Sequence, residues 1–152
     1  VLSTLHTSQR ERALDSFFRS HAGDALVLDK WFSLQAMIPE AETLGRIKRL
    51  MKNHAFSITN PNRVRSLIGA FAMGNQTQFN AVDGSGYAFL ADIVLELDKT
   101  NPQVGARMLS AFRSWRALEP TRRAAAEAQL RRVAAAEQLS PDVRDIAERS
   151  LA

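Results

Sequence analysis

The sequence of 152 residues contains no cysteine and only three histidines, His6, His21 and His54. The lack of cysteine excludes disulfide bonds and thiolate metal sites, and it fits a reducing compartment. No two histidines have the i,i+4 spacing of a helical zinc site, and the motif His-Glu-x-x-His is absent. We therefore expect no metal site and no cofactor built from this chain alone.

Long apolar runs are also missing. No stretch reaches the roughly 18 apolar residues of a transmembrane helix, and no segment has the basic, apolar and small-residue order of a signal peptide. We therefore expect no membrane association and a cytoplasmic location. The chain begins with Val1 and not with methionine, which agrees with trimming or with a fragment cut from a longer protein.

The sequence has no large excess of charge of one sign. It has 20 basic and 16 acidic residues, a net charge of +4. Four arginines between positions 122 and 132 could follow a phosphate backbone, but they alternate with glutamates and lack interleaved aromatic residues. These features favour a solvated arginine-rich surface over a nucleic-acid interface.

Helix signals, by contrast, are frequent, and all five prolines fall at predicted helix edges. The first expected helix is opened by the capping box Ser8–Glu11 and followed by Gly23, and the second is capped by Asp24. Pro39 either stops the second helix or starts the third. The other expected helices run from Asn60 to Gly74, after the loop 83–86, from Asn101 to about Leu118, from Pro120 and from Ser140. Short connections make consecutive helices antiparallel neighbours. The sequence thus predicts a single all-α domain over residues 1–152, with about eight or nine helices in a superhelical array of antiparallel pairs, an armadillo/HEAT-like solenoid.

Two helix starts carry arginine where a cation is disfavoured. Asn60-Pro61 and Asn101-Pro102 each place an N-cap before a first-turn proline. Arginine follows within two turns, although the N-terminal end of a helix carries partial positive charge. An anionic partner would explain both placements.

The first of these helices predicts one buried stripe and two arginines on different faces. Val64, Leu67, Ile68 and Phe71 have the i, i+3, i+4, i+7 spacing of a core-facing stripe. We expect Arg65 to lie close to that stripe and Arg63 to point towards Ser66 and Ala70. Each arginine could pair with an internal carboxylate such as Asp92 or Glu96, or it could bind a carboxylate ligand bidentately.

In the second helix, Gln103 and Arg107 share one face beside the small residues Gly105 and Ala106. This pattern fits either a solvated helix face or the close approach of a ligand or another helix. The segment Asp83-Gly84-Ser85-Gly86 lacks the Gly-Lys-Ser/Thr of a phosphate-binding loop and is interpreted as a tight turn with a helix cap. No set of nucleophile, base and orienting residue can be assembled.

Several stretches together resemble the C-terminal helical domain of the bacterial aminopeptidase N family, which are zinc-dependent gluzincin aminopeptidases. The resemblance extends over residues 13–118 and is weaker beyond; the matching stretches are Leu28–Ala36, Asn60–Ala72, Asp83–Tyr87 with Phe89-Leu90, and Asn101–Val104 with Arg107. Asn80 departs from the histidine expected in relatives. The resemblance implies a fragment of a four-domain enzyme, with the zinc and the catalytic groups outside this chain.

The resemblance also implies a role for three residues. In that family the last domain covers the catalytic cleft and closes a chamber that admits short peptides. Its arginines and a glutamine line the wall on the leaving-peptide side, and they match Arg65, Gln103 and Arg107 here; Arg63 is kept as an internal ion-pair residue. The implied partners are the catalytic domain of the same polypeptide and short peptides, and this chain alone would not be an enzyme. The alternatives are a free-standing helical scaffold for protein partners and, less favoured, a nucleic-acid binder.

Overall fold

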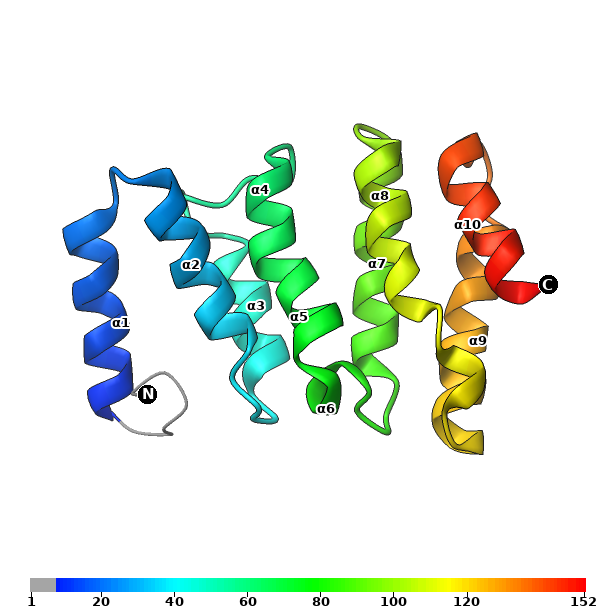
Figure 1. Cartoon of the computed structure of the whole chain (residues 1–152), viewed down its shortest axis with the longest axis horizontal. Coiled ribbons are helices and arrows are strands. Elements are labelled where there is room, and N and C mark those ends of the chain that lie inside the picture. Colours follow the sequence, from blue (N-terminus) through cyan, green and yellow to red (C-terminus); the bar gives the residue numbers. More distant parts are fainter. Residues whose placement is uncertain (1–7) are drawn as a thin grey trace. The chain divides into compact units, whose positions relative to one another are not determined.

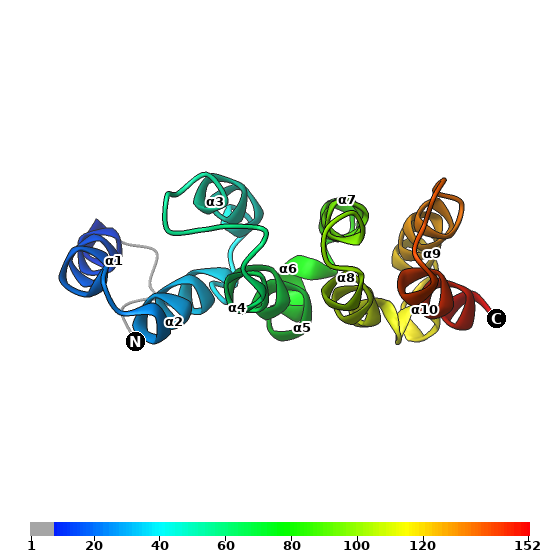
Figure 2. The same ribbon diagram turned by 90° about the horizontal axis from the view of Figure 1, so that it is seen from above.

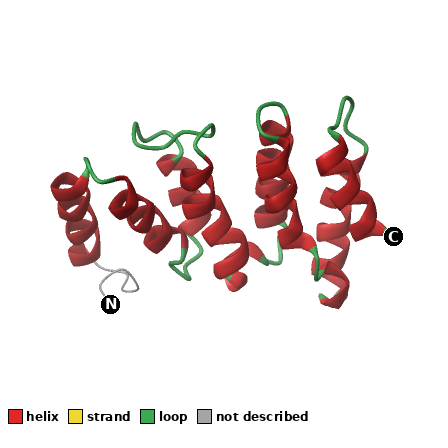
Figure 3. Cartoon of the chain, turned by 45° about the horizontal axis from the view of Figure 1, so that its top comes forward, coloured by secondary structure: helices red, strands yellow, loops and turns green. Residues whose placement is uncertain are grey.

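The computed structural model describes residues 8–152, and within that range all regular structure is helical (Figure 1, Figure 3). The all-α prediction is confirmed. The chain divides into two compact units, Val1–Gln78 and Phe79–Ala152. Each unit has its own buried core.

The first unit is arranged around α2. It contains α1 (Ser8–His21), α2 (Ala25–Ala36), α3 (Thr43–Leu50), and a segment made of α4 (Pro61–Val64), a π-helical turn (Arg65–Gly69) and α5 (Ala70–Gly74). The short α6 (Gln76–Phe79) follows. Helix α2 packs against α1, α3 and the α4–α5 segment, and α1 and α3 lie on one side of it (Figure 2).

Caps and the buried stripe form as the sequence predicts. The Asp24 carboxylate accepts from the backbone N–H of Leu26 at 3.1 Å and of Val27 at 3.3 Å, which fixes the start of α2. The predicted stripe Val64, Leu67, Ile68 and Phe71 is fully buried. Beyond these local features, the Trp31 indole N–H donates to the Leu14 carbonyl at 2.8 Å and ties α1 to α2.

The π-helical turn interrupts the regular helix at Arg65. The Ala70 N–H donates to the Arg65 carbonyl, five residues back, where an α-helix would use the residue four back. A hydroxyl from another helix enters this turn, because Ser33 Oγ donates to the Ser66 carbonyl at 2.9 Å. The turn is therefore held by α2 as well as by its own backbone.

The second unit is a two-layered four-helix arrangement. It consists of α7 (Ser85–Asp98), α8 (Pro102–Leu109), α9 (Pro120–Ala134) and α10 (Pro141–Leu151). Figure 2 shows α7 and α9 in one layer and α8 and α10 in the other, and each helix contacts its layer neighbour and its partner across the layers. Gly105 lets α8 pack closely against α7 and α10, because a Cβ there would lie 3.3 Å from Val143 Cγ2 and 3.5 Å from the Val94 carbonyl oxygen.

Of the two predicted roles of Pro39, the structure agrees with a position after the end of the second helix and not with the start of the third. Helix α3 begins at Thr43, because residues 38–42 form turns: the Ile38 carbonyl accepts from Thr43 Oγ1 at 2.5 Å and from Asn75 Nδ2 at 2.8 Å. The helix after Asn101 ends at Leu109 and not near Leu118. Beyond it the chain tightens into 3₁₀ turns at Ser110–Phe112 and Trp115–Ala117, and the Trp115 indole donates to the Ser150 carbonyl at 2.8 Å.

Candidate functional site

Arg65 is an exposed residue at the first position of the π-helical turn. Its guanidinium donates to the side-chain oxygen of Asn62, which is a neutral partner. The Asn60 side chain caps this helix by accepting from the N–H groups of Asn62 at 3.0 Å and Arg63 at 3.3 Å. The predicted N-cap at Asn60 is therefore confirmed. Arg65, one helical turn after this cap, is exposed to solvent.

Arg63 has the opposite environment, and the expected arrangement of the two arginines was wrong. Arg63 is 7% exposed, and its guanidinium donates to the carbonyls of Ala55 at 2.9 Å and Ala25 at 3.1 Å. It also forms an ion pair with Asp29 and lies over the Phe32 ring, 5.8 Å from the ring centroid. Arg63 is thus an internal ion-pair residue, as interpreted from the sequence, but its partner is on α2.

The carboxylates suggested for that pairing have other positions. Asp92 lies on α7 and pairs with Arg132 at 2.7 Å, and Glu96 is on the same helix. Both belong to the second unit, whereas Arg63 belongs to the first. The suggestion failed because the sequence pattern of one helix does not reveal which distant helix packs against it.

Gln103 and Arg107 both lie exposed on α8, four residues apart. The Asn101 side chain caps this helix by accepting from the Val104 N–H at 3.3 Å. Among the described residues, no ion pair involves Arg107. The structure therefore brings Gln103 and Arg107 onto one exposed face, whereas Arg65 belongs to the other unit; the common wall formed by all three stays a prediction.

The stretches that carried the resemblance pack against one another inside each unit. In the first unit, Leu28–Ala36 contacts Asn60–Ala72 through the Asp29–Arg63 ion pair and the hydrogen bond from Ser33 to Ser66. In the second unit, α7 and α8 carry the other two stretches and pack together. The matching residues thus include the contacts that hold the helices carrying Arg65 and Arg107 against their neighbours within each unit.

The segment Asp83–Gly86 is a turn and helix cap, as interpreted from the sequence. Asp83 Oδ1 accepts from the Ser85 N–H at 2.9 Å. The side chain and backbone of Ser85 both donate to this carboxylate and hold its pKa below the ordinary value. Gly84 has φ of 76°, and a Cβ on Gly86 would lie 2.2 Å from the Phe79 carbonyl oxygen, so both glycines are required by the turn.

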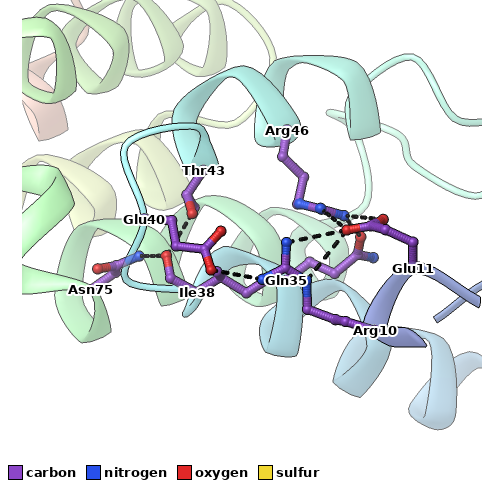
Figure 4. Close-up of polar contacts among 8 residues, drawn as sticks. All are labelled: Arg10, Glu11, Gln35, Ile38, Glu40, Thr43, Arg46 and Asn75. Carbon is purple, nitrogen blue, oxygen red and sulfur yellow. Dashed lines mark hydrogen bonds and ion pairs between the residues drawn. The ribbon is translucent and has the colours of Figure 1, made fainter. Parts of the chain in front are cut away.

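A polar cluster between α1, α2 and α3 was missed by the sequence analysis. Figure 4 shows Arg10 beside Glu11 and Glu40, at 3.2 Å and 2.9 Å, and Arg46 beside Glu11 and Gln35. A possible signal was the polar Gln35 within the otherwise apolar helix, because a buried amide needs partners.

The contacts of the cluster favour the charged forms of Glu11 and Arg10. Hydrogen bonding from Arg46 is the largest cause of the lowered pKa of Glu11, and it outweighs the effect of burial. Burial opposes the charge of Arg10, but hydrogen bonds to Glu40 and Glu11 outweigh it and raise the Arg10 pKa. By formal charge, the two arginines offset the two glutamates.

A groove of about 490 Å³ opens beside this cluster. Its lining residues come from α1, α2, α3 and the turn that follows α3: Glu11, Leu14, Asp15, Trp31, Gln35, Arg46, Arg49, Leu50, Lys52 and Asn53. Within residues 8–152, no three His, Asp or Glu side chains are grouped so that they could hold a metal ion. His6 lies outside the described residues. No helix in the described part of the chain is long and apolar enough to cross a membrane.

Comparison with known proteins places these features in a family. Residues 1–152 match the family model described as "Domain of unknown function (DUF3458_C) ARM repeats". Aminopeptidase N of Caulobacter vibrioides is 40% identical over 142 residues, which are 93% of this chain and 16% of that protein. Aminopeptidase N of Escherichia coli is 40% identical over 129 residues, 85% of this chain and 15% of that protein. The chain thus spans about one sixth of the length of these relatives.

A solved structure shows the same fold. The crystal structure of Legionella pneumophila aminopeptidase A in complex with aspartic acid superposes with a TM-score of 0.93 and 31% identity, over 99% of this chain and 18% of that one. The resemblance to the C-terminal helical domain of bacterial aminopeptidase N is confirmed, and so is the armadillo-type fold. The chain therefore belongs to the DUF3458_C family of ARM-repeat domains, which it shares with bacterial aminopeptidases.

Proposed function

We propose that this chain is the non-catalytic C-terminal domain of a cytoplasmic zinc-dependent aminopeptidase. In that enzyme it covers the catalytic cleft and lines the chamber that admits short peptides, whose N-terminal residues the parent enzyme hydrolyses. The zinc and the catalytic groups belong to the rest of the polypeptide, which is the partner of this domain. The family membership and the aminopeptidase names of the relatives support this assignment.

The observation that carries the chamber role is the exposure of Arg65 and Arg107 without a carboxylate partner. Neither guanidinium pairs with a carboxylate among the described residues, whereas nearby Arg63 has Asp29. The expected cost of a cation at a helix start does not apply here, because Arg107 lies in the last turn of α8 and Arg65 lies beyond the first turn of its helix. An exposed guanidinium without such a partner is available to an anion from outside the domain. The carboxylate at the C-terminus of a short peptide would supply that anion, and Gln103 beside Arg107 adds a donor to the same face.

The experiment compares two substrates of the full-length enzyme carrying Arg107→Ala. Turnover of a short peptide should fall about tenfold or more in kcat/KM, since a charge-assisted contact contributes about 1.5–3 kcal/mol. A single-residue chromogenic amide has no C-terminal carboxylate and should be nearly unaffected. Equal losses on both substrates would contradict a peptide-binding role.

The second candidate function is a free-standing scaffold for protein partners. It is favoured by the large apolar side chains that remain exposed on the first unit, which are Leu26 at 79%, Met73 at 46% and Met37 at 44% exposure. The length of the native polypeptide separates the two functions. A long upstream region with His-Glu-x-x-His supports the aminopeptidase domain, and a polypeptide of only this length supports the scaffold.

A further inference from the structure

The groove of the first unit is lined by charged and apolar residues, and polar surface predominates. Leu14, Trp31 and Leu50 contribute its smaller apolar part from α1, α2 and α3, although Leu14 is only 7% and Trp31 only 5% exposed. Its volume of about 490 Å³ lies within the range of roughly 300–1,000 Å³ that small-molecule sites occupy. The groove is formed within one unit, so its walls are set by the packing of α1 and α3 on α2.

The charges along this groove divide into two groups. Glu11 and Arg46 are paired within the polar cluster. Asp15, Arg49 and Lys52 also line the groove, but no ion pair in the described part of the chain involves them. One anion and two cations are therefore left to interact with a ligand.

We propose that this groove binds a zwitterionic ligand with apolar side chains, namely a short peptide with free termini. Its ammonium group pairs with Asp15, its carboxylate pairs with Arg49 and Lys52, and its apolar side chains lie over Leu14, Trp31 and Leu50. This site is separate from the proposed chamber wall, because neither Arg65 nor Arg107 lines the groove.

The mixed charges select this ligand over simpler ones. A dicarboxylate or phosphate would use Arg49 and Lys52 but would be repelled by Asp15. A purely apolar ligand would leave all three charges without partners where it excludes water, which is costly. A peptide zwitterion satisfies both signs, and its side chains cover the smaller apolar part of the lining.

The test titrates the chain with the dipeptide Leu-Leu and follows the two tryptophan indole N–H signals by NMR. Trp31 lines the groove, whereas Trp115 lies in the other unit and serves as an internal reference. We expect the Trp31 signal to shift saturably while the Trp115 signal stays in place. N-acetyl-Leu-Leu lacks the ammonium group and Leu-Leu-amide lacks the carboxylate, so each should bind about three- to tenfold more weakly.

Variants separate the groove from other peptide sites. Asp15→Asn and Arg49→Ala should weaken Leu-Leu binding by the same three- to tenfold, and both positions are exposed, so the fold should persist. Arg12→Ala, on the same helix but outside the groove, should leave binding unchanged. No saturable Trp31 shift, equal binding of the blocked dipeptides, or the same loss of the Trp31 response in Arg12→Ala as in Asp15→Asn would overturn the proposal. The test of the chamber wall measures kcat/KM of the full-length enzyme carrying Arg107→Ala, so its failure can be told apart from failure of the groove proposal.

Discussion

Removal of the Arg63 side chain tests how much the ion pair between α4 and α2 contributes to the stability of the first unit. In the structure Arg63 is 7% exposed, and its guanidinium donates to two backbone carbonyls and pairs with Asp29, whose side chain is 19% exposed. Breaking a buried pair costs about 3–5 kcal/mol, because the remaining charge stays desolvated. Asp29 retains some water contact, so we expect Arg63→Ala to destabilise the chain by about 3 kcal/mol.

The assay is urea unfolding followed by circular dichroism, together with amide hydrogen exchange at Val64 and Leu67 to isolate the first unit. Arg65→Ala is the matched control: it removes the same side chain two residues away, from an exposed position, and should change stability by less than about 0.5 kcal/mol. Asp29→Asn in the Arg63→Ala background should restore part of the loss, because the isolated charge is gone. Equal effects of the two alanine substitutions would refute the reasoning.

The remaining predictions concern packing, turn geometry and pH. Phe71→Ala should cost about 3–5 kcal/mol in the same unfolding assay, and Arg107→Ala less than about 1 kcal/mol. Gly86→Ala should cost about 1–3 kcal/mol, since its Cβ would lie 2.2 Å from the Phe79 carbonyl oxygen. Glu11 has a lowered pKa, so its stabilisation is complete above its unfolded value of about 4.3 and is lost as the pH falls through the folded value. Glu11→Gln should therefore flatten the acid side of the stability profile, and an unchanged profile would contradict the role of Arg46.

Local features of this fold were predictable because their signals are contiguous in the sequence. The caps at Asp24, Asn60, Asn101 and Ser140 satisfy backbone N–H groups two or three residues ahead. The buried stripe of the fourth helix needs only its own periodicity. These signals gave the helical class and most helix starts correctly.

Features that depend on partners far apart in the sequence were not predictable in the same way. Thr43 starts α3 because its hydroxyl and the Asn75 amide both reach the Ile38 carbonyl, and Asn75 comes 37 residues later. Asp29 reaches Arg63 across 34 residues. The groove also needs three helices to be placed before its charges can be grouped. For the candidate site, the sequence named Arg65, Gln103 and Arg107, but it identified neither the exposure of Arg65 nor the interior contacts, such as Asp29 with Arg63, that hold these helices.

The hydroxyl of Ser33 has a consequence for how sequences of this family vary. It donates to the Ser66 carbonyl within the π-helical turn that begins at Arg65. Alanine at position 33 removes that donor, and a regular α-helical turn then becomes the better alternative for the backbone. Positions 33 and 65–69 should therefore vary together among relatives, with a serine or threonine at 33 retained wherever the turn is retained. We expect this coupling although position 33 and residues 65–69 belong to different helices.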